Sequence, residues 1–147
     1  MKRSPLKRKP FKKKKAGDLS EIKKLLKKAW NLMSIYVRLR DGKCITCNSR
    51  LNLQAGHFIH GKLDFDERNI NAQCRRCNFF KSGNLADYAV YLEDKFGYGI
   101  IQDLQSDAGM IAKHTVEELS YTILALTEKI EILKNQRKER VNGKAEG

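Results

Sequence analysis

The sequence predicts a single, mainly helical α+β domain, in which a cysteine-tied central module is flanked by amino- and carboxy-terminal helices. All four cysteines lie in two identical Cys-x-x-Cys pairs within residues 44–77. Apolar residues recur at helical spacing on both sides of that region. The 147 residues suffice for one modest core but not for two.

Positive charge is concentrated in the first quarter of the chain. The net charge is +13, and residues 1–40 carry fifteen basic residues against two acidic ones, whereas the remainder is balanced. Such a segment gains affinity by neutralising phosphates, so nucleic acid is the expected partner. An anionic membrane surface, or a hydrated tail without a partner, is the alternative. The tail residues expected to contact DNA are Lys12, Lys13, Lys14 and Lys15.

Residues 1–17 are expected to form a disordered basic tail, because they hold nine basic residues, both prolines and few large apolar side chains. The amino terminus does not resemble a secretory signal peptide. No apolar run approaches the roughly 18 residues that a membrane-spanning helix needs. We therefore expect a soluble, intracellular protein that does not enter membranes.

A basic amphipathic helix is expected over residues 18–41. Asp18 followed by Glu21 indicates a capping box at its start, and Asp41 with Gly42 indicates its end. The apolar stripe consists of Ile22, Leu25, Ala29, Leu32, Tyr36 and Leu39. Most of the basic residues lie off this stripe, so the helix can pack on one side and present cations on the other.

The two cysteine pairs predict one zinc site. The ligands would be Cys44, Cys47, Cys74 and Cys77, with twenty-six residues between the pairs. Four thiolates complete a tetrahedral shell and leave no position for substrate, so this zinc would be structural. Two disulfides, two unrelated pairs of buried thiols or a redox Cys-x-x-Cys are the alternatives.

Between the cysteine pairs and after them, the sequence patterns that indicate secondary structure are shorter. Residues 51–59 alternate in polarity and predict a two-stranded hairpin or ribbon. A helix is expected to begin near Arg75 or Cys77 and to be interrupted at Gly83. Residues 85–92 then carry a second apolar stripe.

The carboxy-terminal region, residues 98–142, is predicted to be helical. A short helix is expected around residues 100–104, and the capping box of Thr115 and Glu118 opens a long final helix. One face of that helix carries an apolar stripe, which we call its seam, made of Val116, Leu119, Ile123, Leu126, Ile130 and Leu133. This spacing favours either a dimeric coiled coil or packing against the helix of residues 18–41.

The order Cys-x-x-Cys, His57, Asn69, Cys-x-x-Cys, Asn78 and Lys81 resembles the HNH nucleases, whose ββα-metal module binds a catalytic ion. More narrowly, three segments resemble the lambdoid phage NinG proteins, also called Rap, which are branched-DNA endonucleases. These segments are AGHF at 55–58, ERNI at 67–70 and the stretch 73–85. The resemblance covers roughly residues 29–140 and is strongest over 44–92.

This resemblance implies a zinc-stapled HNH nuclease module over residues 42–97 and a metal-dependent endonuclease specific for DNA structure. Its substrates would be branched recombination intermediates, such as Holliday junctions and D-loops, in the cytoplasm of the host cell. Branched or duplex DNA would be the partner, together with other phage or host recombination proteins. Because resolving a junction needs two nicks, a homodimer is expected.

His57 is the expected general base, because a neutral imidazole accepts a proton near physiological pH. The resemblance implies that Asn69 orients this imidazole and that the carbonyl oxygen of Asn78 binds Mg²⁺ or Mn²⁺. His114 is expected to be structural, and Phe79 and Phe80 are expected in the core. The basic residues expected to contact phosphate, or merely to be solvated, are Arg75, Arg76 and Lys81.

Gly56 departs from the HNH pattern, because many of these enzymes carry an Asp or His metal ligand immediately before the general base. We expect the replacement from the acidic loop 64–67, with Asp66 chosen, since a hard cation prefers carboxylate. Other candidates are His60, Asp64 and Glu67, or no further protein ligand.

Two other functions fit parts of the pattern. A non-catalytic zinc-knuckle protein that binds nucleic acid would explain the charge, the cysteines and the missing ligand at Gly56. A sequence-specific HNH homing or restriction nuclease is less compatible with so small a chain without an obvious recognition domain.

Overall fold

The computed structural model describes residues 16–110 and 113–145, so the predicted tail contacts Lys12, Lys13, Lys14 and Lys15 lie outside the described residues. The mainly helical α+β composition is confirmed. In chain order the elements are α1 (Ala16–Asp41), β1 (Leu53–His57), β2 (Ile70–Cys74), η1 (Arg76–Phe80), α2 (Leu85–Phe96), α3 (Ile100–Met110) and α4 (Val116–Ala145).

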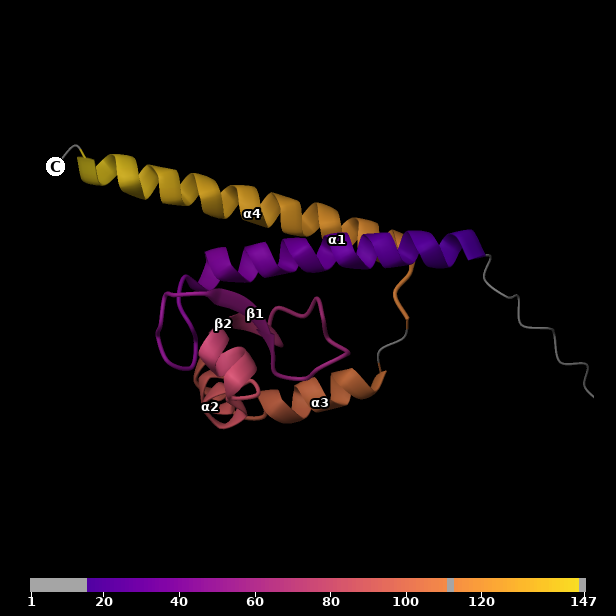
Figure 1. Cartoon of the computed structure of the whole chain (residues 1–147), viewed down its shortest axis with the longest axis horizontal. Helices are drawn as coiled ribbons and strands as arrows, with labels where there is room; N and C mark the ends of the chain where they lie inside the picture. Colours follow the sequence, from indigo (N-terminus) through magenta and orange to yellow (C-terminus); the bar gives the residue numbers. More distant parts are fainter. Residues whose placement is uncertain (1–15, 111–112, 146–147) are drawn as a thin grey trace, which may run out of the picture.

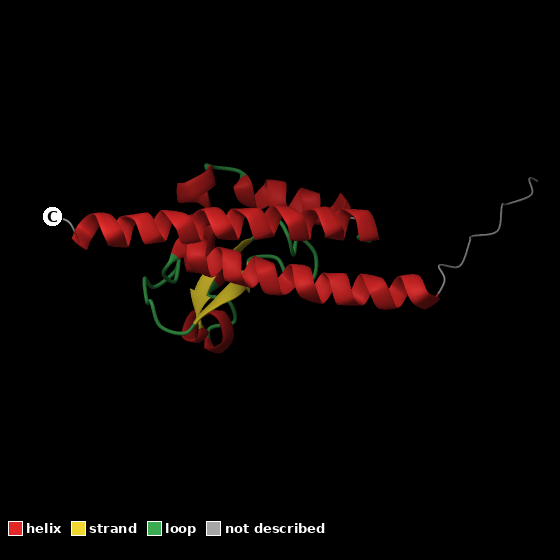
Figure 2. Cartoon of the chain, turned by 90° about the horizontal axis from the view of Figure 1, so that it is seen from above, coloured by secondary structure: helices red, strands yellow, loops and turns green. Residues whose placement is uncertain are grey.

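The elements form layers around the small sheet. Helices α1 and α4 lie side by side and run in the same direction on one side of it, while α2 and α3 cover the other side (Figures 1 and 2). One apolar cluster joins α1 and α4 to Ile70 of β2, and a second joins α2 and α3 to Leu63 of the loop between the strands. The sheet is therefore held between two helical layers.

Helix α1 ends at Asp41, as predicted, and begins at Ala16, two residues earlier than predicted. Its buried face is centred on Ala29, Met33, Tyr36 and Val37, which overlaps the predicted stripe. This face packs on the sheet and on α4 because both present apolar side chains to it.

The sheet contains two antiparallel strands, with Leu53 opposite Cys74 and His57 opposite Ile70. The prediction of a hairpin within residues 51–59 is wrong, because the second strand comes from residues 70–74. All five residues of that strand are buried, and Asn71 and Gln73 are polar. The sequence INAQC does alternate apolar and polar residues, but it is only five residues long and has Ile70 as its one β-branched residue, so it is a weak strand signal.

Helix α4 begins as predicted: the backbone N–H of Glu118 donates to Thr115 Oγ1 at 3.2 Å, and the Thr115 N–H donates to Glu118 Oε2 at 2.9 Å. Leu126 and Ile130 of its seam are buried against α1. Of the two alternatives for this seam, packing within the chain is the one observed. The outer face of α4 exposes Tyr121.

The segment after β2 starts with the short turn η1, in which the N–H of Lys81 donates to the carbonyl of Arg76 at 2.9 Å. Gly83, with φ of +87°, interrupts the helical path as predicted. Helix α3 is longer than predicted and reaches Met110. Within the part of the chain that the structure describes, no helix combines the length and apolarity needed to cross a membrane.

Candidate metal centre and active site

The four cysteines converge on one point. Their sulfur atoms all lie within 4.8 Å of one another, although the residues come from three places: the turn after α1, the end of β2, and η1. Each thiol is free, and only Cys47 is exposed. This arrangement is the one that a tetrahedral Zn²⁺ site requires, so the donor set fits the predicted structural zinc.

Contacts within the cluster shift the thiol pKa values in opposite directions, since the pKa of Cys44 falls whereas that of Cys47 rises to about 12. Burial raises the pKa of Cys44, but hydrogen bonds from Thr46 and from neighbouring backbone groups outweigh it and lower that pKa to about 6. Burial raises the pKa of Cys77. Four thiolates at this separation repel one another, and a divalent cation in their midst removes that repulsion.

His57 is the last residue of β1 and is partly accessible. Its ring stacks on Trp30 of α1, with centroids 4.6 Å apart and planes 13° from parallel. Its Nε2 lies 3.2 Å from Oδ1 of Asp64, and its side chain is 18% exposed. The centroid of the His60 ring lies 5.3 Å from the centroid of the His57 ring. The imidazole is thus held between an aromatic surface and a carboxylate, and it still reaches solvent.

Asn69 is fully buried and bonds to backbone. Its Oδ1 accepts from the N–H of Ile59 at 2.7 Å, and its Nδ2 donates to the carbonyls of Ile59 at 3.0 Å and Leu63 at 3.2 Å. These bonds fix the chain just after His57. Asn69 therefore acts on the loop that carries the neighbours of the imidazole, and these bonds involve no atom of the imidazole ring.

The structure places Asp64, and not Asp66, beside His57. Asp66 accepts from the Arg68 guanidinium at 2.6 Å and from the Arg68 N–H at 2.8 Å. Burial raises the pKa of Asp66, but this pairing with Arg68 outweighs it and holds the pKa below its ordinary value. Arg68 also binds Asp107 of α3. The choice of Asp66 as an ion ligand is not supported, because its carboxylate already holds the loop to α3 through Arg68.

Asn78 lies in η1, and its side chain contacts Gln54 of β1. Its Nδ2 donates to Oε1 of Gln54 at 3.0 Å. Gln54 and His57 are three positions apart on β1, so their side chains leave opposite faces of the strand. The two groups expected to share one ion thus contact different sides of β1.

The space beside Gly56 is filled by Gln73 of β2. A Cβ atom at position 56 would lie 2.3 Å from Oε1 of Gln73. The Gln73 Nε2 donates to the carbonyl of Gly83 at 2.7 Å, while its Oε1 is buried without a hydrogen-bond partner among the described residues. No side chain fits at position 56 while Gln73 stays in place, which explains the glycine.

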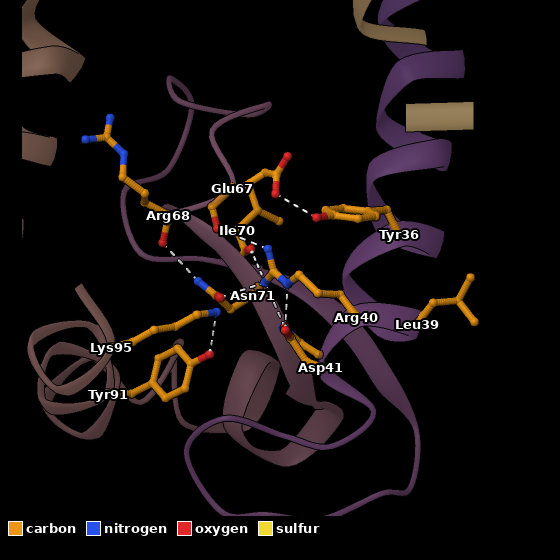
Figure 3. Close-up of polar contacts among 12 residues, drawn as sticks. Tyr36, Leu39, Arg40, Asp41, Glu67, Arg68, Ile70, Asn71, Tyr91 and Lys95 are labelled. Carbon is orange, nitrogen blue, oxygen red and sulfur yellow. Dashed lines mark hydrogen bonds and ion pairs between the residues drawn. The ribbon is translucent and has the colours of Figure 1, made fainter. Parts of the chain in front are cut away.

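A polar network that the sequence analysis missed joins α1 to β2 and to the loop before it (Figure 3). The Arg40 guanidinium donates to Oδ1 of Asn71 at 2.7 Å and to the carbonyls of Ile70 at 3.1 Å and Glu67 at 3.2 Å. Asp41 accepts from the N–H of Ala72 at 2.7 Å. These bonds fix the end of the loop that carries Asp64.

The basic residues around η1 are at the surface: Arg75, Arg76 and Lys81 are all exposed. The expectation that Phe79 and Phe80 lie in the core is wrong, since their exposed fractions are 69% and 68%. Only Cys77 of this turn is buried, because the short turn points that side chain alone at the cysteine cluster.

The fold and the site define a mainly helical α+β protein with a four-cysteine cluster compatible with structural zinc. More particularly, the chain belongs to the NinG family: the family model described as "Bacteriophage Lambda NinG protein" matches residues 2–138.

Several curated phage proteins are similar to this chain. It is 34% identical over 122 residues to "Protein ninG" of Escherichia phage 933W and to that of Salmonella phage P22, and 33% identical to that of Escherichia phage lambda. These alignments cover 78% of the chain and 59–60% of the relatives. The chain thus spans about 60% of the length of these relatives. No solved structure matches it significantly.

Proposed function

We propose that the chain is a metal-dependent endonuclease that cleaves branched DNA, such as a Holliday junction or a D-loop, with His57 as general base. The observation that carries this proposal is the pairing of the His57 imidazole with Asp64 at 3.2 Å in a partly accessible position. An imidazole oriented by a carboxylate is the arrangement that general-base catalysis uses. The order of residues that resembles the HNH nucleases agrees with it.

The proton path follows from the tautomer that this pairing favours. With a proton on Nε2, His57 donates to Asp64, and Nδ1 is then the nitrogen that accepts a proton from the attacking water. Trp30 holds the ring plane by stacking, and Asn69 holds the chain segment behind it. The stacking limits rotation of the imidazole, and the bonds of Asn69 fix the backbone that follows it.

Hydrolysis of a phosphodiester also needs a cation to offset charge on the phosphate and on the leaving oxygen, which Mg²⁺ or Mn²⁺ supplies when bound. Asp64 is the carboxylate closest to His57, and its oxygens suit a hard cation. We propose that Asp64 contributes a ligand, with water and substrate phosphate completing the shell. Asn78, on the other side of β1, would bind DNA or a separate ion.

The expected DNA contact uses the basic residues 1–40 together with Arg75, Arg76 and Lys81. Contacts to backbone phosphates favour recognition of DNA shape over sequence. Removal of residues 1–15 should weaken binding to every DNA alike and flatten its salt dependence. Two nicks across a junction need two active sites, so we retain the proposed homodimer, with a contact surface other than the seam of α4 that packs on α1.

The decisive experiment incubates the purified protein with a four-way junction, a linear duplex and a single strand, each in Mg²⁺, Mn²⁺ or EDTA. Metal-dependent nicking of the junction is expected, and His57→Ala should abolish it while binding persists. Asp103→Asn, an exposed acidic residue of α3, is the matched control and should cleave normally. Cleavage by His57→Ala at the wild-type rate would refute the role given to His57.

The second candidate function is a non-catalytic protein that binds nucleic acid through a zinc-stapled module. Two observations favour it. Gly56 supplies no side chain as a metal ligand, and Asn78, bonded to Gln54, contacts the face of β1 opposite to that of His57. This candidate predicts tight, salt-sensitive binding to DNA without cleavage in any of the metals.

A further inference from the structure

We infer that Phe79 and Phe80 form a stacking site for unpaired or unstacked bases at the branch of a DNA substrate. This inference rests on the proposed DNA-binding function and goes beyond it, because it assigns recognition of the branch to a particular surface.

The first observation is the exposure of two adjacent aromatic rings. Phe79 and Phe80 are 69% and 68% exposed, and their rings meet edge to face with centroids 5.3 Å apart and an interplanar angle of 88°. Two neighbouring Phe side chains left in water forgo the burial that normally stabilises such residues. In the described chain this pair therefore requires an explanation other than core packing.

The second observation is that the turn that carries the pair is anchored on several sides. Cys77, two residues before Phe79, is 1% exposed and belongs to the cysteine cluster. Asn78 is bonded to Gln54 of β1, and the N–H of Gly83 donates to the carbonyls of Cys77 and Asn78 at 3.0 Å. The backbone that carries the two rings is therefore held in place by contacts on both sides of the pair.

The third observation is charge. Arg75, Arg76 and Lys81 flank the pair, and the Arg75 guanidinium lies 5.7 Å from the centre of the Phe80 ring. The chain has no acidic residue from position 69 to position 86. An exposed aromatic pair flanked by three exposed cations is complementary to nucleic acid, where phosphates meet the cations and bases stack on the rings. A purely apolar protein partner would leave these three cations buried or unpaired.

The geometry also indicates why the ligand would be branched DNA and not a perfect duplex. In a continuous duplex every base is stacked on its neighbours, so an aromatic ring gains little there. At a branch point, base stacking is interrupted and a base face can meet the ring. Stacking of one base on an aromatic side chain changes affinity by about tenfold or more.

The test measures binding in EDTA, so that cleavage does not enter. The probes are a four-way junction, a three-way junction and a linear duplex of the same sequence, with 2-aminopurine at the branch. The variants are Phe79→Ala/Phe80→Ala and the milder Phe79→Leu/Phe80→Leu, which keeps apolar bulk without an aromatic face. Tyr98→Ala, which alters an aromatic residue that is 97% exposed outside η1, is the control.

We expect both double variants to bind the junctions about tenfold more weakly than wild type, with unchanged binding to the linear duplex and unchanged zinc content. The 2-aminopurine signal should change on binding of wild type and of Tyr98→Ala only. Equal losses on junction and duplex, or no loss, would overturn the inference. Light scattering that shows a wild-type dimer and monomeric double variants would reassign the rings to a contact between copies of the chain.

These outcomes separate the inference from the proposed function. If wild type prefers junctions through the two rings but cleaves nothing, the endonuclease proposal fails and the stacking site stands. If wild type cleaves junctions and the double variants bind them normally, only the stacking site fails. Failure of wild type to bind any of the three DNAs would overturn both.

Discussion

The Nε2 atom of His57 lies 3.2 Å from Oδ1 of Asp64, although the two residues are separated by a turn and belong to different segments. Asn69, buried and bonded to the backbone of Ile59 and Leu63, holds that turn in shape. The pairing thus depends on the loop that Asn69 organises as much as on the strand that carries His57.

Asp64→Asn should therefore reduce cleavage without reducing DNA affinity. The amide retains the size of the carboxylate but loses the charge that stabilises the protonated imidazole and that would attract a cation. A reduction of about 10²-fold or more in the rate of junction nicking is expected, as is usual for the loss of general acid–base assistance. The measurement is the single-turnover rate of junction nicking in saturating Mg²⁺. The Asp66→Asn variant is measured beside it, for its nicking rate and for its melting temperature.

The two variants should differ in thermal stability. Asp66→Asn removes the partner of Arg68, so it should lower the melting temperature more than Asp64→Asn does. If Asp66→Asn lost cleavage at full stability while Asp64→Asn cleaved normally, Asp66 and not Asp64 would be the ligand of the catalytic ion.

Zinc removal should unfold the central module. The four sulfur atoms lie within 4.8 Å of one another and come from the turn after α1, from β2 and from η1, so removal of the cation loosens the junction of these three segments. Elemental analysis should find one zinc ion per chain, and Cys74→Ser should lose it together with a cooperative melting transition. Full zinc binding by Cys74→Ser would argue against the four-thiolate site.

The parts of the fold that the sequence predicted are those with strong local signals. Capping residues Thr115 and Glu118 mark the start of α4, and Gly83 marks the break after η1, because caps and positive φ angles depend on few neighbours. The convergence of the cysteines follows from their spacing, because metal ligands of this type must meet.

The parts that could not be predicted depend on tertiary contacts. Strand β2 buries Asn71 and Gln73, whose partners come from α1 and from the turn after η1. The alternation of INAQC indicates which residues share a face of the strand, but not which groups elsewhere in the chain bond to the two amides. The position of Asp64 beside His57 could not be predicted for the same reason, since only the folded loop shows that Arg68 engages Asp66.

Replacement of Gly56 by alanine should destabilise the protein. The new Cβ would lie 2.3 Å from Oε1 of Gln73, which is held by its bond to the carbonyl of Gly83, so the strand or the amide must move. A loss of about 1–3 kcal/mol in the free energy of unfolding is expected, as for other overpacked cores. Urea denaturation followed by circular dichroism measures it.

The double variant Gly56→Ala/Gln73→Ala provides the test of cause. Removing the Gln73 amide frees the space, so the cost of alanine at position 56 should be smaller in the Gln73→Ala background than in wild type. Strict additivity of the two changes would mean that Gln73 is not what excludes a side chain at position 56.

Stability should fall in acid partly through Glu67, which links α1 to α4. Its carboxylate accepts from the Tyr36 hydroxyl at 2.6 Å and pairs with Lys129. Burial raises the pKa of Glu67, but Lys129 and Tyr36 outweigh it and hold the pKa below its ordinary value of 4.5. The ionised form is therefore favoured by folding, so this stabilisation is present above 4.5 and is lost as the pH falls through the lowered pKa.

Glu67→Gln should accordingly lower the free energy of unfolding near neutral pH, by up to about 1 kcal/mol because the pair is partly exposed. Below the lowered pKa the variant and wild type should converge, since the wild-type side chain is then also uncharged. Urea denaturation across this pH range tests the expectation, with Glu131→Gln, which removes an exposed pairing within α4, as the control. A Glu67→Gln deficit of the same size at every pH would show that shape, and not charge, is what Glu67 contributes between the two helices.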